Sequence, residues 1–141
     1  MSQDEFCQPV RVYIEDTDAG GIVYYVNYLK YMERARTEFM RSLGFDRDAI
    51  FGADRLFVVR DVAIDYHAPA RLDDVLSVGV SVLGVRGASM SLRQVVCRAG
   101  ETLVSGRVGI ACVGRHDLRP RRMPKDMLAT LRSRSPESSK T

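Results

Sequence analysis

The chain has 141 residues, the usual size of one domain and too few for two separate hydrophobic cores. Hydrophobic residues make up 45% and charged residues 28%, which is typical of a soluble globular protein and excludes a disordered chain. The formal net charge is only +3, and no apolar run approaches the roughly 20 residues that a membrane-spanning helix needs, so stable membrane insertion is not expected.

The positive charge is concentrated near the C-terminus. Residues 115–141 carry 8 Lys or Arg and 3 Asp or Glu, whereas residues 1–114 carry 13 and 15. We interpret this end as a solubilising tail, with contact to phosphates or an anionic surface as the alternative. Cys7, Cys97 and Cys112 are odd in number and lack metal-ligand spacing, and the N-terminus lacks a signal-peptide pattern. These features predict a cytoplasmic protein with reduced thiols.

The first part of the chain predicts a strand followed by a helix. Residues Val10 to Ile14 read as a short strand, and the turn-forming sequence DTDAGG follows it. Apolar residues then recur at three- and four-residue steps, which is the stripe of an amphipathic helix. We predict a helix over about Asn27 to Leu43, with Asn27 as a candidate N-cap and Gly44 at its end.

The second part of the chain predicts strands. Apolar residues alternate with polar or small ones in four segments, which the sequence predicts to be consecutive antiparallel neighbours: residues 56–66, 76–82, 90–96 and 104–112. Pro124 to Leu131 predict a short terminal helix. One long helix and about five strands predict an α+β fold, in which an antiparallel sheet buries the helix.

Several classes of site are excluded by elimination. His67 and His116 are the only histidines, lie 49 positions apart and have no cysteine pair beside them, so no metal site is expected. The sequence contains no GxSxG, GxxxxGK or GxGxxG motif, and it shows no helix-turn-helix or other nucleic-acid-binding signature. Neither a cofactor nor a nucleic-acid partner is therefore predicted.

The remaining candidate is the junction EDTDAGGIVYY, where the turn meets the helix. A helix N-terminus has unpaired N–H groups and about half a positive charge, so it can polarise a carbonyl group. A carboxylate in the same turn, from Asp16 or Asp18, would stay ionised and could act as nucleophile or general base. A thioester suits such a site because a thiol of pKa about 8.5 is a good leaving group. The alternative is a plain turn before a helix, with acidic residues that only stabilise it.

The sequence RVYIEDTDAGGIVYYVNYLKYMERARTEFMRSLGF resembles the signature of the YbgC-like and 4-hydroxybenzoyl-CoA thioesterases of the hotdog-fold superfamily. The similarity continues through FVVRDVAIDYHAPARLDDVLSVGVSV and VRGASM, and covers roughly residues 10–113. The resemblance implies a hotdog fold, in which a five-stranded antiparallel sheet wraps around one long helix. It also implies a homo-oligomer, either a dimer or a tetramer of dimers, with active sites at the dimer interface. We assign residues 1–132 to this domain and residues 133–141 to a flexible tail.

The resemblance also implies roles for individual residues. Asp18 would be the catalytic carboxylate, and the backbone N–H of Tyr25 would bind the thioester carbonyl. Gly21 would allow close approach of the substrate, and Val26 would contact it. CoA would lie along the sheet edge, where its phosphates or pantetheine would meet three residues of the VRGAS turn: Arg86, Gly87 and Ser89.

Alternatives remain open at the sequence level. Many YbgC-like proteins have histidine where this chain has Tyr25, whereas the hydroxybenzoyl branch has tyrosine, so the acyl group is not specified. Glu33 is a second candidate base, because another hotdog branch uses a helical glutamate. A different class of function is a non-catalytic module that binds acyl-CoA or acyl carrier protein. A hotdog dehydratase would need a histidine near the helix start, and none is present there.

Overall fold

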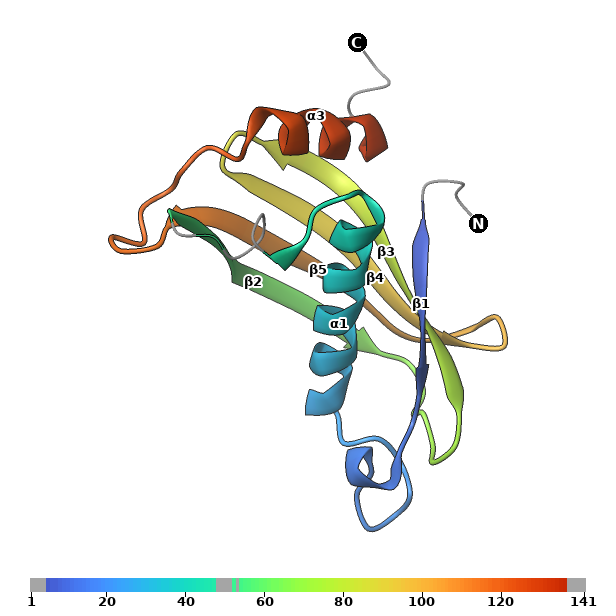
Figure 1. The fold of residues 1–141 in the computed structure, drawn as a ribbon. Coiled ribbons are helices and arrows are strands. Elements are labelled where there is room, and N and C mark those ends of the chain that lie inside the picture. The colour runs from blue at the N-terminus through green and yellow to red at the C-terminus, as the bar shows by residue number, and fades with distance from the viewer. Residues whose placement is uncertain (1–4, 48–51, 53, 137–141) are drawn as a thin grey trace.

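Figure 1 shows a computed structural model of the chain, which describes residues 5–47, 52 and 54–136. Helix α1 (Val26–Ser42) lies against one face of an antiparallel sheet, and a shorter helix, α3 (Lys125–Arg134), lies near one end of the sheet. The five strands are β1 (Phe6–Arg11), β2 (Arg55–Tyr66), β3 (Val75–Arg86), β4 (Ser89–Arg98) and β5 (Glu101–Gly114). The predicted α+β class and the five-stranded antiparallel sheet are confirmed.

The order of strands in the sheet is β1-β3-β4-β5-β2, and every pairing is antiparallel. The prediction of consecutive neighbours is correct for β3, β4 and β5 but wrong for β2, which pairs with β5 instead of β3. The first strand is also earlier than predicted, because Ile14 belongs to a one-turn 3₁₀ helix, η1 (Ile14–Asp16). The strands β1 and β2 therefore form the two edges of the sheet.

The core lies between α1 and the sheet. The face of α1 that carries Tyr28, Met32, Ala35 and Phe39 is buried, and alternate residues of the strands pack against it. The predicted span of the helix is confirmed to within one residue at each end. The predicted N-cap is wrong: the N-cap is Tyr25, and Asn27 instead donates its side-chain N–H to the backbone oxygen of Asp16.

Helix α3 covers one end of the core with three buried side chains: Met127, Leu128 and Leu131. It extends to Arg134, beyond the predicted start of the tail at residue 133, and Ser135 donates its hydroxyl hydrogen to the backbone oxygen of Leu83 at 3.4 Å. Residues 137–141 lie outside the described part of the chain, so the boundary of the tail stays a prediction.

Candidate active site

The turn before α1 is a small hairpin. Thr17 and Val23 form a bridge, and the N–H of Asp18 donates to the backbone oxygen of Ile22 at 2.9 Å. Gly21 closes the tip, because its N–H donates to the backbone oxygen of Asp18 at 3.1 Å with φ at +78°. Asp18 therefore lies at the tip of the hairpin.

The carboxylate of Asp18 is exposed and only partly engaged. Its Oδ1 accepts the N–H of Gly20 at 2.8 Å, and its Oδ2 accepts no hydrogen bond from the described residues. The carboxylate of Asp16 also accepts one backbone N–H, that of Tyr13 at 2.9 Å, and closes η1. Asp16 is half-buried in this turn, whereas Asp18 is exposed at the tip, so Asp18 is the more accessible of the two candidate carboxylates.

The first turn of α1 presents two unpaired backbone donors. The N–H of Asn27 donates to Tyr24 at 2.8 Å, and the N–H of Tyr28 donates to Tyr25 at 3.3 Å. The N–H groups of Tyr25 and Val26 donate to no other described residue. Both lie at the positive end of the helix dipole, where an oxygen that gains negative charge is stabilised.

No hydrogen bond or ring contact joins Asp18 to Tyr25 within these described residues. The backbone of Tyr24 pairs with that of Asp16 at the base of the hairpin, so Tyr25 follows the base while Asp18 occupies the tip. The two predicted catalytic residues belong to one hairpin–helix junction but lie at its two ends, and the single chain leaves both exposed. A substrate that uses both must therefore lie across the hairpin.

An aromatic cluster that the sequence interpretation missed surrounds the helix start. The ring of Tyr25 lies 5.0 Å from that of Tyr24 and 6.2 Å from that of Tyr66, measured between centroids, and Tyr28 lies 5.7 Å from Tyr66. Burial, with Tyr25 and Tyr28 nearby, raises the pKa of Tyr66, so its hydroxyl stays protonated at neutral pH. The alternation of β2 could place Tyr66 on a sheet face but could not place it beside α1.

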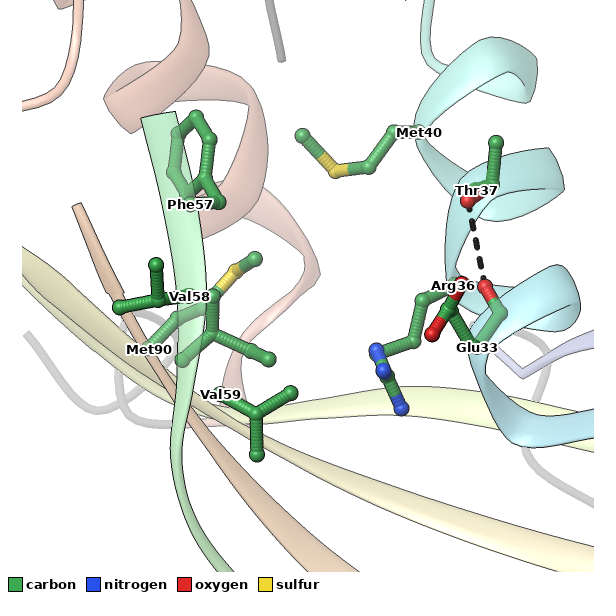
Figure 2. A pocket seen from close by; sticks show the side chains of 9 residues that line it. Glu33, Arg36, Thr37, Met40, Phe57, Val58, Val59 and Met90 are labelled. Atoms are coloured by element: carbon green, nitrogen blue, oxygen red, sulfur yellow. Dashed lines mark hydrogen bonds between the residues drawn. The ribbon is translucent and has the colours of Figure 1, made fainter. Parts of the chain in front are cut away.

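A groove of about 450 Å³ runs between α1 and β2 (Figure 2). Its sheet wall is apolar, whereas its helix wall carries Arg36, Thr37 and Glu33, the second candidate base. Figure 2 shows the guanidinium group of Arg36 pointing into the groove. Burial lowers the pKa of Arg36, and the nearby Glu33 carboxylate opposes that shift. The apolar side chains lining the groove include Met40, Phe57, Val58, Val59, Met90 and Ile110.

The predicted CoA-binding residues lie at the other end of the sheet from the N-terminus of α1 (Figure 1). The C-terminal segment packs on the β3–β4 turn there: Met123 donates its N–H to Gly87 at 2.9 Å. Arg122 lies so close to Gly87 that a Cβ at position 87 would come within 2.9 Å of its Nη1. Neither Arg86 nor Arg122 forms an ion pair with the residues that the structure describes. This end of the sheet is therefore basic and offers donors to an anion.

Two further observations concern the described part of the chain. It contains no group of three or more His, Cys, Asp or Glu side chains that could hold a metal ion. It also contains no helix long and apolar enough to cross a membrane.

Comparison with known proteins identifies the family. A family model described as the thioesterase superfamily matches residues 20–105. The chain belongs to the thioesterase superfamily. Two relatives in this superfamily are the acyl-CoA thioester hydrolase YbgC of Escherichia coli and the acyl-CoA thioesterase YbgC of Haemophilus influenzae. The first is 42% identical over 92% of this chain and 97% of its own length, and the second is 43% identical over 92% and 96%.

Solved thioesterase structures have the same fold. A probable thioesterase from Bartonella henselae superposes with a TM-score of 0.79 and 33% identity, covering 85% of this chain and 99% of the other. A 1,4-dihydroxy-2-naphthoyl-CoA thioesterase from Synechocystis gives a TM-score of 0.83 over 90% and 95% of the two chains, and its 20% identity supports the fold alone. The predicted hotdog fold and the resemblance to YbgC-like thioesterases are confirmed.

Proposed function

We propose that this chain hydrolyses acyl-CoA thioesters to a free acid and CoA. The observation that carries the proposal is the pair of unpaired N–H groups, from Tyr25 and Val26, beside a turn that presents Asp18. The relatives named YbgC, which match more than nine tenths of this chain, support the same reaction. An N–H pair at a helix start suits a carbonyl oxygen that becomes negative during acyl transfer.

In the proposed mechanism, the thioester oxygen accepts the N–H of Tyr25, and the N–H of Val26 adds a second donor. The free oxygen of Asp18 either attacks the carbonyl carbon or removes a proton from the attacking water. In the first route, CoA leaves as a thiolate and water then hydrolyses the acyl anhydride on Asp18. In the second route, the tetrahedral intermediate collapses directly to acid and thiolate. In both routes the thiolate takes up a proton from water.

We place both ends of the substrate toward the same end of the sheet, because Met90 lines the groove between α1 and β2 and directly follows the β3–β4 turn. The acyl group would enter the apolar groove between α1 and β2, past the exposed Leu29 of α1. The CoA phosphates would meet Arg86, Gly87 and Ser89 at the β3–β4 turn. Along β5 this turn lies about 23 Å from Tyr66, because a strand rises about 3.3 Å per residue. A long, extended thiol ester such as acyl-CoA suits that separation.

A second copy of the chain would complete the site. β2 is an edge strand, and its residues from Val59 to Ala63 are exposed on both faces. The exposed fractions of three side chains on this strand are large: 47% for Val59, 43% for Val62 and 48% for Tyr66. An edge strand without a partner rarely exposes this much apolar surface. We propose that β2 pairs with another β2, that the dimer covers the hairpin tip, and that such dimers can form tetramers.

The proposal includes a compartment and a partner. The three cysteines form no disulfide in the structure, which suits the reducing cytoplasm. An acyl carrier protein would present the same thioester chemistry on a shorter carrier group, so it is the protein partner that we propose.

The test is to follow thiol release from short-chain, long-chain and aromatic acyl-CoAs with the wild type and with Asp18→Asn. We expect kcat to fall by at least about 10²-fold, the scale of one essential acid-base group. Asp16→Asn is the matched control, because the Asp16 carboxylate closes η1 through the N–H of Tyr13 and takes no part in the proposed mechanism. This variant should have a lower free energy of unfolding than the wild type but the same kcat.

The outcomes separate the candidate functions. Equal activity of Asp18→Asn and the wild type would remove Asp18 from the mechanism. Saturable binding of acyl-CoA without thiol release in the wild type would instead favour the non-catalytic binding module.

A further inference from the structure

The outer face of the sheet, away from α1, carries two arginines directly opposite each other. Arg93 of β4 pairs in register with Arg107 of β5. Their sequence neighbours Leu92 and Val108, each 1% exposed, face the core, so alternation along the strands turns both arginines outward. Like charges on directly opposite residues destabilise an antiparallel pair. An anion held between the two guanidinium groups would remove that repulsion.

The same row of the sheet provides no counter-charge. The residues that flank the pair are Ser81 on β3 and Ala63 on β2. Neither arginine forms an ion pair with a residue that the structure describes. The two positive charges therefore lack a partner in their own row.

Two acidic residues lie diagonally from the pair, one on each side. Asp61 packs against Gly109 and is engaged by Arg60, whose Nε lies 3.2 Å from its Oδ1. Asp65 pairs in register with Ser105 and lines the same hollow as the arginines. One free carboxylate thus faces two unpaired guanidinium groups, and the surface keeps an excess of positive charge.

The arginines border a hollow of about 380 Å³. Small residues, Ala63 and Gly106 among them, leave the space open between the longer side chains. Ser105 lines the same hollow, and its Oγ lies 2.9 Å from Nε2 of His67, which fixes the position of the hydroxyl group. A second hollow of about 200 Å³ shares Arg107 with the first and includes Arg86.

We propose that this outer face is a phosphate-binding site, in which one phosphate group lies between Arg93 and Arg107 and contacts the hydroxyl of Ser105. A guanidinium group offers planar, paired donors that match phosphate oxygens, so two of them can bracket one phosphate. The adjoining hollow beside Arg86 accommodates a second phosphate. The ligand class is a diphosphate or bisphosphate, either a free phosphorylated metabolite or the nucleotide end of CoA.

The bracket formed by Arg93 and Arg107 does not depend on the proposed hydrolase activity. The hollow beside Arg86 is where that function places the CoA phosphates, so the nucleotide end of CoA as the ligand rests on the proposed function. α1 lies on the opposite face of the sheet, and Arg93 and Arg107, which bracket the phosphate, take no part in the proposed mechanism. The failure of the bracket and the failure of the proposed function would therefore be seen in separate measurements.

The test is calorimetric titration of the full chain at low ionic strength with inorganic pyrophosphate and, separately, with adenosine 3′,5′-bisphosphate. We expect saturable binding to the wild type and a dissociation constant at least about tenfold weaker for the double variant Arg93→Gln/Arg107→Gln. The matched control is Arg132→Gln/Arg134→Gln, which removes the same charge from α3. It should bind both probes as the wild type does.

The double variant should remain folded, because removing the opposed arginines removes a repulsion. We expect it to melt no lower than the wild type without added anion, and to lose the rise in Tm that pyrophosphate gives the wild type. A bisphosphate that binds at least about tenfold tighter than pyrophosphate identifies the nucleotide as the source, and equal binding identifies phosphate alone. The proposal is overturned if the wild type binds neither probe, or if both double variants lose binding equally.

Discussion

Single residues decide where the candidate nucleophile lies. The hairpin that presents Asp18 depends on Gly21, whose φ of +78° lies in the left-handed region that residues with a side chain rarely adopt. Gly20, its neighbour, has no such requirement, but its Cα faces Oδ1 of Asp18 closely enough that an added Cβ would lie 3.3 Å from that oxygen. The two adjacent glycines therefore have different roles, one in the backbone and one in the space beside the carboxylate.

We expect Gly21→Ala to lower the free energy of unfolding by about 1–2 kcal/mol, the cost of a left-handed conformation for a residue with Cβ. A Cβ at position 21 would meet no atom within 4 Å, so crowding would add nothing to this cost. Urea denaturation measures the change. Gly21→Asn should lose less, because asparagine tolerates this conformation. Equal stability of Gly21→Ala and the wild type would show that the turn relaxes without strain.

Among the elements, α1 is fixed to the sheet by a buried polar link as well as by apolar packing. Gln94 of β4 is 0% exposed, and its Nε2 donates to the backbone oxygen of Met32 at 2.9 Å. Its Oε1 accepts Nη1 of Arg36 at 2.9 Å. A buried amide that satisfies both a helix oxygen and a guanidinium group specifies the position of the helix along the strand.

We expect Gln94→Leu to lower the free energy of unfolding by about 1–3 kcal/mol, because it leaves Arg36 half-buried without its acceptor. The double variant Arg36→Met/Gln94→Leu should lose less than the sum of the two single variants, since removing both partners removes the unsatisfied group. Denaturation curves of the four proteins give the coupling. Strictly additive losses would mean that the hydrogen bond between Arg36 and Gln94 contributes no stability.

At the scale of the whole molecule, local patterns predicted elements better than their arrangement. The apolar stripe of α1 is read within the helix itself, so its span was predicted to within a residue. The position of β2 beside β5 depends on pairs that range from Tyr66 with Val104, 38 positions apart, to Arg55 with Gly114, 59 positions apart. The alternation within a strand does not indicate which other strand it pairs with. Tyr66 is an example from the candidate site. The alternation of β2 indicated the face of the sheet on which Tyr66 lies, but its contact with Tyr25 depends on strand order and was not predicted.

Some residues of the candidate site could be predicted from local sequence, and others could be placed only by the structure. Asp18, Gly21 and Tyr25 are close in sequence, so a turn before a helix already predicts that they share one junction. Gln94 looks like any polar residue in a strand, and only the packed structure shows that it is buried under α1. The use of Asp16 as a stabiliser could be anticipated, because acidic side chains often close such turns.

The exposed edge strand leads to a test of assembly. Val62 lies on β2 with 43% of its surface exposed, and a lysine there would place a charge on the apolar edge that we propose pairs with a second copy. We expect Val62→Lys to shift the protein from dimer or larger to monomer in analytical ultracentrifugation, and kcat to fall at least about tenfold because an interface site is left incomplete. Val75→Lys is the matched control: Val75 is 52% exposed on β3, away from this edge, so its assembly and activity should match the wild type. A wild type that is active as a monomer would contradict the proposed interface, whereas an active, dimeric Val62→Lys would place that interface elsewhere.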